Sequence, residues 1–213
     1  MKNVLKRKVI FVAGLHGTEQ MPVRALTDAG IGFVLGNPKA CEQKVRFTKR
    51  DINAAFGVDA NDYESRRAQE VLVEIDETNL VVDFHSTESE TEPFAIVVDK
   101  DMIPFAKTTG VTRIVFMNHN IKDGHALINY RDGVSVEVGL HESKNSYGTT
   151  LRTVENVSQR KEHEAALYEV FGAISEPGDY INFHDHADGF IPILANESVY
   201  EKEGLFGLKA REL

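Results

Sequence analysis

Short apolar runs separated by helix-like stretches constrain the fold of this 213-residue chain more than any other feature. Each run is rich in β-branched residues and ends in Gly or a polar cluster, which is typical of buried strands. The runs lie near residues 8–14, 31–36, 80–85, 94–98, 112–117 and 134–138. Strands that alternate with helices indicate βαβ units. We therefore expect an α/β fold with a mixed, largely parallel sheet flanked by helices.

Helices are expected over residues 22–29, 62–77 and 155–173. In 62–77 the apolar residues recur at helical spacing, with charged residues on the opposite face. Residues 155–173 repeat this pattern. After about Ile174 the character of the sequence changes.

The segment 174–213 is predicted to form a small β-rich lobe packed on a main domain that comprises residues 1–173. A turn signal at 176–179 is followed by strand-like pieces around 180–183 and 190–194. The lobe is therefore expected to consist of short strands.

The net charge of −9 argues against a nucleic-acid or anionic-membrane partner. No apolar run approaches the roughly 20 residues that span a bilayer. The charged N-terminus, residues 1–8, precedes an apolar run too short for a signal peptide, which predicts a cytoplasmic location. The one cysteine, Cys41, cannot form an internal disulfide and is expected to be a small, partly buried hydrophobe.

Two of the strand-like runs lead into metal-ligating residue types. His16 and Glu19 follow the first run in a His-x-x-Glu pattern, and His85 ends the run at 80–85. Two imidazoles and one carboxylate are the ligand set of a catalytic zinc, which keeps one position open. Open α/β sheets place their sites at such strand ends. The pattern predicts one zinc per chain, although His-x-x-Glu alone is common in solvated loops. Asp83 shares a strand face with His85 and is a candidate to orient a ligand imidazole.

Four further motifs follow in a fixed order along the chain. They are Asn37-Pro38-Lys39-Ala40, the run from Arg46 to Asp51-Ile52-Asn53, Glu137 in Val136-Glu137-Val138-Gly139, and Asn196-Glu197-Ser198-Val199-Tyr200. Together with the two metal segments, this order resembles the aspartoacylase/succinylglutamate desuccinylase family, a branch of the zinc-carboxypeptidase fold. The resemblance covers most of the chain and implies that residues 1–173 form a catalytic domain of that fold.

The resemblance implies a role for each matching residue. Glu137 would take a proton from water and pass it to the leaving nitrogen, and Arg46 would stabilise the oxyanion. Asn53 and Tyr200 would bind substrate. Taken alone, each of these residues is more commonly a surface charge, a turn residue or an edge aromatic. Arg50 lies close enough in sequence to compete with Arg46 for its role.

One position departs from the family pattern. The pattern continues Asp-Leu-Asn-Arg, but here Ala54 stands where the carboxylate-clamping Arg is expected. Either Arg50 or Arg131 replaces that cation, or the substrate lacks the carboxylate. The departure points away from N-acetylaspartate and succinylglutamate. The chain is also short for the family, which predicts a reduced C-terminal lobe and a more open site.

The favoured hypothesis is a zinc-dependent amidohydrolase, a deacylase that cleaves an N-acyl amino acid or a similar small amide. Its expected partner is a small anionic or amide substrate. The sequence leaves open whether the chain forms a homo-oligomer. The alternatives are a metallocarboxypeptidase acting on short peptides and a catalytically silent zinc-binding or small-molecule-binding module. His184 and His186 imitate a second metal pair but are expected to be polar residues of the lobe, and His141 is close enough to Glu137 in sequence to line a pocket.

Overall fold

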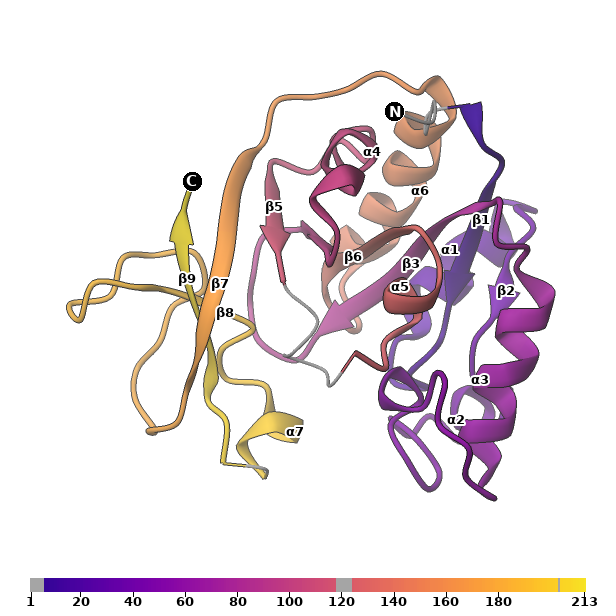
Figure 1. Ribbon diagram of the computed structural model, residues 1–213, viewed down its shortest axis with the longest axis horizontal. Coiled ribbons are helices and arrows are strands. Elements are labelled where there is room, and N and C mark those ends of the chain that lie inside the picture. Colours follow the sequence, from indigo (N-terminus) through magenta and orange to yellow (C-terminus); the bar gives the residue numbers. More distant parts are fainter. Residues whose placement is uncertain (1–5, 118–123, 203) are drawn as a thin grey trace.

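The computed structural model describes residues 6–117, 124–202 and 204–213. In these residues nine strands form one sheet in the order β2-β1-β3-β6-β4-β5-β7-β9-β8, with helices on both faces (Figure 1). The strands are β1 (Val9–Ala13), β2 (Val34–Leu35), β3 (Leu80–Thr87), β4 (Phe94–Val97), β5 (Arg113–Phe116), β6 (Gly133–Leu140), β7 (Ala166–Ile174), β8 (Ile191–Ile193) and β9 (Gly207–Glu212).

Parallel pairing predominates in this sheet. The pairs β1–β2, β1–β3, β3–β6, β4–β5 and β5–β7 are parallel, whereas β4–β6, β7–β9 and β8–β9 are antiparallel. The predicted mixed, largely parallel α/β sheet is therefore confirmed.

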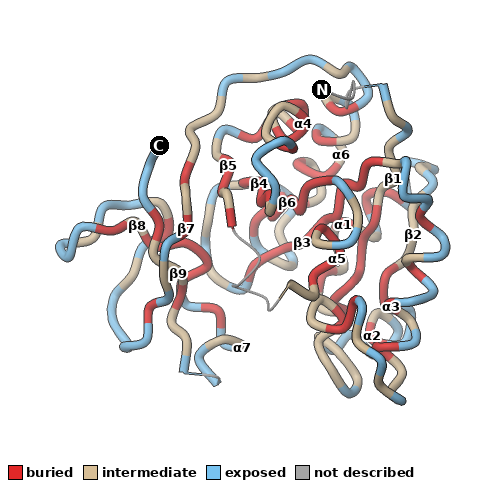
Figure 2. The backbone as a smooth tube through the Cα atoms, in the orientation of Figure 1, coloured by how far each residue is buried: buried red, intermediate tan, exposed pale blue. Residues whose placement is uncertain are grey.

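Side-chain alternation along the central strands divides the interior into separate clusters. Leu80, Val82 and Phe84 of β3 pack with α1 (Gln20–Asp28), α4 (Ile103–Lys107) and α6 (Lys144–Gln159). Val81 faces the other way, toward α3 (Tyr63–Glu74) and α5 (Leu127–Tyr130). Because alternate residues point to opposite faces, Asp83 and His85 lie on the α3 and α5 face with Val81. Figure 2 shows that the central strands are largely buried, whereas exposed residues gather in the outer helices and loops.

The remaining short elements lie in the connections. They are α2 (Pro38–Gln43), α7 (Ser198–Glu201) and two 3-10 helices, Ile52–Ala54 and Lys100–Met102. The first 3-10 helix follows Asp51, whose carboxylate accepts from the Asn53 N–H at 2.8 Å. This cap fixes the end of the Arg46–Asn53 run beside the sheet.

Two of the three expected helices are confirmed. The segment 22–29 falls on α1, and 62–77 falls on α3, which begins after Asp62 because that carboxylate accepts from the Ser65 N–H at 2.8 Å. The third expectation, a helix over 155–173, is wrong. The helix α6 ends at Gln159, and β7 occupies Ala166–Ile174.

Local features of α6 and of β7 explain this error. The buried face of α6 is mainly hydroxyl-bearing and includes Thr149, Thr150 and Thr153, so an apolar pattern does not mark where the helix lies. Arg160 then ends the helix in the left-handed conformation, with φ of 57°. In β7 apolar residues lie on both faces of the strand, because Phe171 and Ala173 are exposed between the buried residues Val170 and Ile174. The sequence therefore lacks the alternation of apolar and polar residues that would mark a strand.

The segment after Ile174 extends the same sheet. The strand β9 pairs with β7, and β8 pairs with β9 in the region of the expected strand at 190–194. Residues 180–183 form no strand, and β9 was not predicted. The boundary between 1–173 and 174–213 falls at the end of β7, and the division into two domains stays a prediction. No helix among the described residues is long and apolar enough to cross a membrane.

Candidate active site

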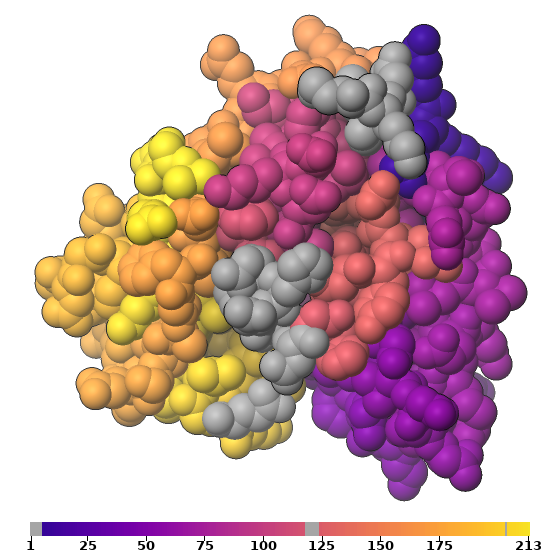
Figure 3. All heavy atoms as spheres, viewed as in Figure 1, coloured from indigo at the N-terminus to yellow at the C-terminus, as the bar shows by residue number. Residues whose placement is uncertain are grey.

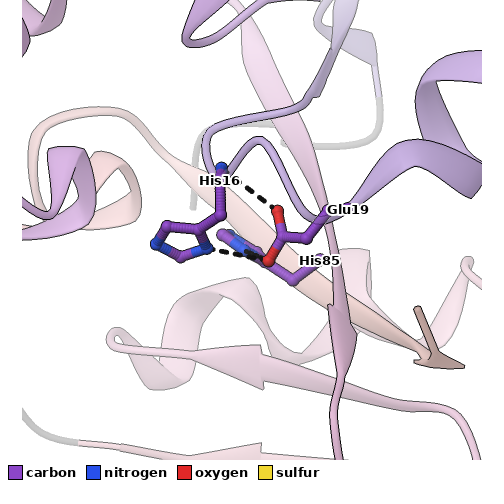
Figure 4. A group of neighbouring side chains, drawn as sticks. All are labelled: His16, Glu19 and His85. Carbon is purple, nitrogen blue, oxygen red and sulfur yellow. Dashed lines mark hydrogen bonds and ion pairs between the residues drawn. The ribbon is translucent and has the colours of Figure 1, made fainter. Parts of the chain in front are cut away.

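Three buried side chains converge beyond the end of β1 and near the end of β3. Figure 4 shows His16, Glu19 and His85 directed toward one another. Their exposed fractions are 3%, 1% and 4%, and their ligand atoms lie within 4.8 Å of one another. The Nδ1 atoms of His16 and His85 lie 2.8 Å and 3.1 Å from the same oxygen, Glu19 Oε1. The structure thus brings the three predicted metal ligands together.

The turn that carries His16 depends on Gly17. A Cβ atom at Gly17 would lie 2.0 Å from the Ala40 carbonyl oxygen and 2.4 Å from that of Val45. No residue with a side chain fits such a close approach of two backbone segments. The Gly17 N–H also donates to the Arg46 carbonyl oxygen at 3.1 Å. The ligand turn is therefore seated directly on the segment that carries Arg46.

A carboxylate holds the outer nitrogen of each imidazole. His16 Nε2 lies 2.9 Å from Asp51 Oδ1, and His85 Nε2 lies 2.7 Å from Asp83 Oδ2. Such contacts fix the ring orientation and the tautomer of metal-ligating histidines. Asp83 thus contacts a ligand imidazole as the sequence predicted, and that imidazole belongs to His85. Asp51 had no predicted role, although it lies in the run that the motif analysis singled out.

The electrostatics of the cluster favour bound positive charge. Burial would lower the pKa of His85, but the carboxylates of Asp83 and Glu19 outweigh it and raise that pKa well above its usual value. Burial would raise the pKa of Glu19, but His16 and His85 hold it well below its usual range. Glu19 is therefore an anion. The surrounding carboxylates thus favour positive charge at the imidazoles, which a bound metal ion would supply in place of protons.

The donor set fits zinc. Two imidazole nitrogens and one carboxylate oxygen converge from two segments, both outer nitrogens have carboxylate partners, and the pocket leaves room beside the ligands. Three protein ligands with an open position are typical of catalytic zinc. Among the described residues this is the one group of His, Cys, Asp and Glu side chains with metal-ligand geometry.

Glu137 lies on β6 directly beside the ligand set. Its Cα is the register partner of His85, and its side chain is 8% exposed. Glu137 Oε2 is buried without a hydrogen-bond partner. Burial raises the pKa of Glu137 to about 7; His85 opposes that shift, while Glu19 and Glu197 add to it. A carboxylate with a pKa near neutrality is suited to accept and return a proton.

Arg46 faces the pocket from the segment after α2. Its guanidinium donates to Asp51 Oδ2 at 3.2 Å, and its Nε is buried without a partner. Burial would lower the pKa of Arg46, but neighbouring groups, Asp51 first, outweigh it and raise that pKa. The guanidinium is thus a fixed positive charge. Asp51 joins it to His16, so one carboxylate orients both groups.

A family model matches most of the chain over this region. The Succinylglutamate desuccinylase/Aspartoacylase catalytic domain matches residues 6–158. The chain belongs to this family. Family members are zinc enzymes, and the chain is homologous to deacylases that hydrolyse amide bonds. No sequence among the curated proteins matches the chain.

Solved structures share the fold at low identity. Murine aminoacylase 3 is 17% identical, with a TM-score of 0.79 over 97% of this chain and 95% of that one. The succinylglutamate desuccinylase from Chromobacterium violaceum is 18% identical, with a TM-score of 0.73 over 97% and 85% of the two chains. The ectoine utilization protein EutE from Ruegeria pomeroyi is 18% identical, with a TM-score of 0.65 over 88% and 70%. The chain has the zinc-carboxypeptidase-like fold of this family.

Both residues predicted to bind substrate by resemblance to the desuccinylase/aspartoacylase family line the pocket. Asn53 and Tyr200 do so together with Arg46 and Glu137. Asn53 Oδ1 accepts from the Leu127 N–H at 3.3 Å, which ties the 3-10 helix to α5. Tyr200 comes from α7 in the C-terminal segment. The pocket is therefore lined by residues from the N-terminal third of the chain and from its C-terminal segment.

The two cations proposed to replace the Arg missing at Ala54 are directed elsewhere. Arg131 donates to the carbonyl oxygens of Leu72 and Ile75, at 2.6 Å and 2.8 Å, where α3 ends. Arg50 pairs with Asp62 at 3.2 Å and is 41% exposed. Neither lines the pocket, so the structure does not support their assignment to substrate binding. Arg131 binds the carbonyl oxygens at the end of α3, and Arg50 pairs with Asp62, which caps the start of the same helix.

Glu197 is a pocket residue that motif analysis missed, although it precedes Tyr200 in the quoted segment. It is 4% exposed, and its carboxylate accepts from the Glu88 and Ser89 N–H groups at 3.0 Å and 3.1 Å. In return, the Ser198 N–H donates to Glu88 at 2.9 Å. These bonds fasten the segment before α7 to the loop after β3.

The remaining histidines singled out in the sequence lie outside the ligand set. His141 is hydrogen-bonded through Nδ1 to the hydroxyl of Ser86, at 2.7 Å, and touches the pocket only through that serine. His184 contacts the Asn182 carbonyl oxygen, and His186 stacks on Phe190. The expectation that His184 and His186 are ordinary polar residues of the lobe agrees with these contacts.

Proposed function

We propose that the chain is a zinc-dependent amidohydrolase that removes the acyl group from an N-acyl amino acid or a similar small amide. The observation that carries the proposal is the buried carboxylate of Glu137, whose Oε2 has no hydrogen-bond partner, beside the convergent ligand set. A metal-binding module needs no such group. Family membership supports an amide deacylase on independent grounds.

Amide hydrolysis needs an activated water, a stabilised oxyanion and a proton for the departing amine. His16, Glu19 and His85 would hold the zinc ion, which when bound would supply Lewis acidity and make water easier to deprotonate. Glu137 takes a proton from the attacking water and returns it to the leaving nitrogen. Its burial suits the second step, because a carboxylic acid with a raised pKa keeps its proton until the nitrogen needs it.

Arg46 stabilises the negative charge that develops on the carbonyl oxygen. A fixed guanidinium in a partly desolvated pocket interacts with that charge more strongly than one in water. Asp51 holds this guanidinium and also His16, so the oxyanion site keeps its position relative to the metal ligands. Asp51 therefore acts as a positioning residue.

The test is release of primary amine from N-acyl amino acids by the zinc-loaded protein and by Glu137→Gln. We expect the substitution to lower kcat by about 10²–10⁴-fold, because the amide accepts no proton, while the zinc content stays at one per chain. The matched control is Glu77→Gln, an exposed glutamate remote from the pocket, which keeps full activity. Turnover by Glu137→Gln at the parent rate would contradict the mechanism.

Product analysis separates this function from peptidase activity. A deacylase releases a free acyl acid, whereas a metallocarboxypeptidase releases a C-terminal amino acid from a peptide. If peptides were cleaved and N-acyl amino acids were not, the peptidase would replace the deacylase.

A further inference from the structure

The pocket has an apolar side that the proposed chemistry does not use. Ile96, Val98, Met117, Ile128 and Leu194 line it and are here called the apolar wall. They come from β4, the residues after β4 and β5, α5 and the C-terminal segment. All but Val98 are buried, with exposed fractions between 5% and 7%. Side chains from separate segments thus form one continuous apolar surface.

The register of the sheet places this wall relative to the ligands. Asp83 pairs with Ser135 on β6, Ser135 pairs with Ile96 on β4, and Ile96 pairs with Val115 on β5. Residues in one such row share a face of the sheet. The row therefore runs from the carboxylate that holds His85 to the apolar wall. Strand β6, which carries Glu137, lies between them.

This order determines which part of a substrate meets the wall. The scissile amide lies at the ligand set, and Glu137 returns a proton to its nitrogen. The leaving amine therefore lies on the Glu137 side of the carbonyl group. The wall lies beyond Glu137 on that same side, so it faces the amino acid that is released.

Resting on the proposed deacylase function, we propose that the apolar wall is the subsite for the side chain of the released amino acid. The substrate is then an N-acyl derivative of an aliphatic or other apolar amino acid, such as N-acetylleucine or N-acetylmethionine. Burial of an apolar side chain against the wall removes it from water and is favourable.

The charge around the wall disfavours a substrate that carries a side-chain carboxylate in addition to its α-carboxylate. Glu19, Glu137 and Glu197 line the same pocket. A carboxylate placed against the wall would lose hydration without gaining a cationic partner among the described lining residues, because Arg46 is held by Asp51 across the pocket. The sequence points the same way, because Ala54 stands where the family pattern has an Arg that would bind a substrate carboxylate.

The experiment compares kcat/KM for N-acetylleucine and N-acetylmethionine with N-acetylaspartate and N-acetylglutamate, using the zinc-loaded protein. We expect at least a 10-fold preference for the apolar pair, the order of discrimination that an apolar pocket achieves. Met117→Lys is expected to reduce or invert that preference. Val73→Lys, which places the same charge on an 86% exposed position, leaves it unchanged.

The outcomes separate the two proposals. Equal rates, or faster turnover of the acidic pair, would overturn the apolar subsite and leave the deacylase intact. If none of the four compounds were hydrolysed by zinc-loaded protein, the deacylase proposal would fail. Calorimetric binding of the same compounds would then decide the subsite: at least 10-fold tighter binding of N-acetylleucine than of N-acetylaspartate supports it, and equal binding overturns it.

Discussion

The ligand side and the apolar wall face each other across one pocket but are held in place by different forces. On the ligand side, both ring nitrogens of His16 and His85 have carboxylate neighbours within 3.1 Å. The wall is held by packing between segments that are distant in sequence, and Ile96, Met117, Ile128 and Leu194 share one hydrophobic cluster.

This difference separates chemistry from specificity. Hydrogen bonds to ionised groups are directional, and removing one partner leaves a buried group unsatisfied. Apolar contacts are non-directional and tolerate exchange at similar volume. Substitutions on the ligand side should therefore alter metal binding and every substrate alike, whereas substitutions in the wall should alter only the choice of substrate.

The largest effect on zinc affinity is expected from Asp83→Asn on the ligand side. Loss of the carboxylate leaves His85 Nε2 without an ionic partner, and zinc affinity should fall about 10–100-fold. Competition with a chromophoric chelator measures the affinity. Asp188→Asn, at an exposed site in the lobe, is the matched control and should bind zinc as the parent does. Parent-like affinity in Asp83→Asn would show that this carboxylate does not support the ligand.

A smaller effect is expected from Met117→Ala in the wall. Truncation removes apolar contact with the substrate and should lower kcat/KM for N-acetylleucine roughly 10-fold. Zinc affinity should not change, because no ligand or carboxylate partner of a ligand is touched. If zinc affinity fell as far as in Asp83→Asn, the two sides would not be independent.

The smallest effect concerns Cys41, which lies behind the ligand side. Burial raises the pKa of the Cys41 thiol to about 11, and the Glu19 carboxylate adds to the shift. A raised pKa means less thiolate at a given pH, so about one thiol in a thousand is ionised at pH 8. Iodoacetamide should therefore label the native protein much more slowly than the urea-unfolded protein. Equal labelling rates would show that the thiol is neither buried nor shifted.

The ligand side was largely predictable from sequence, and the wall was not. His16, Glu19 and His85 stand in short motifs at strand ends, so the local pattern and the sheet edge suffice to bring them together. The wall residues are ordinary apolar side chains. Only the strand order and the β4–β6 antiparallel pairing place Ile96 beside Ser135.

The same reasoning explains the errors in secondary structure. A helix is detectable when its buried face is apolar, but α6 buries Ser146, Thr149, Thr150 and Thr153 against the sheet. A strand is detectable when apolar and polar residues alternate, but β7 carries an apolar residue on its exposed face, since Phe171 is 53% exposed. Arg131 is close to Glu137 in sequence, which suggests a place in the pocket. Its guanidinium instead caps the end of α3, a contact that the spacing along the chain does not reveal.

Two parts of the chain form opposite flanks of the molecule. In Figure 3 the C-terminal segment, orange to yellow, lies on one flank, and the N-terminal third, indigo to purple, lies on the other. Glu197 and Ser198 link the two flanks through the loop after β3. Strand β7 connects them a second time through the sheet.

The bridge formed by Asp51 limits how the proposed site can be redesigned. One carboxylate contacts both His16 of the proposed metal site and Arg46 of the proposed oxyanion site, so we expect a substitution at Asp51 to alter both. A change of reaction at this site would then require both partners of Asp51 to change together. If the apolar wall binds the released side chain, in contrast, single substitutions there would suffice to change the substrate.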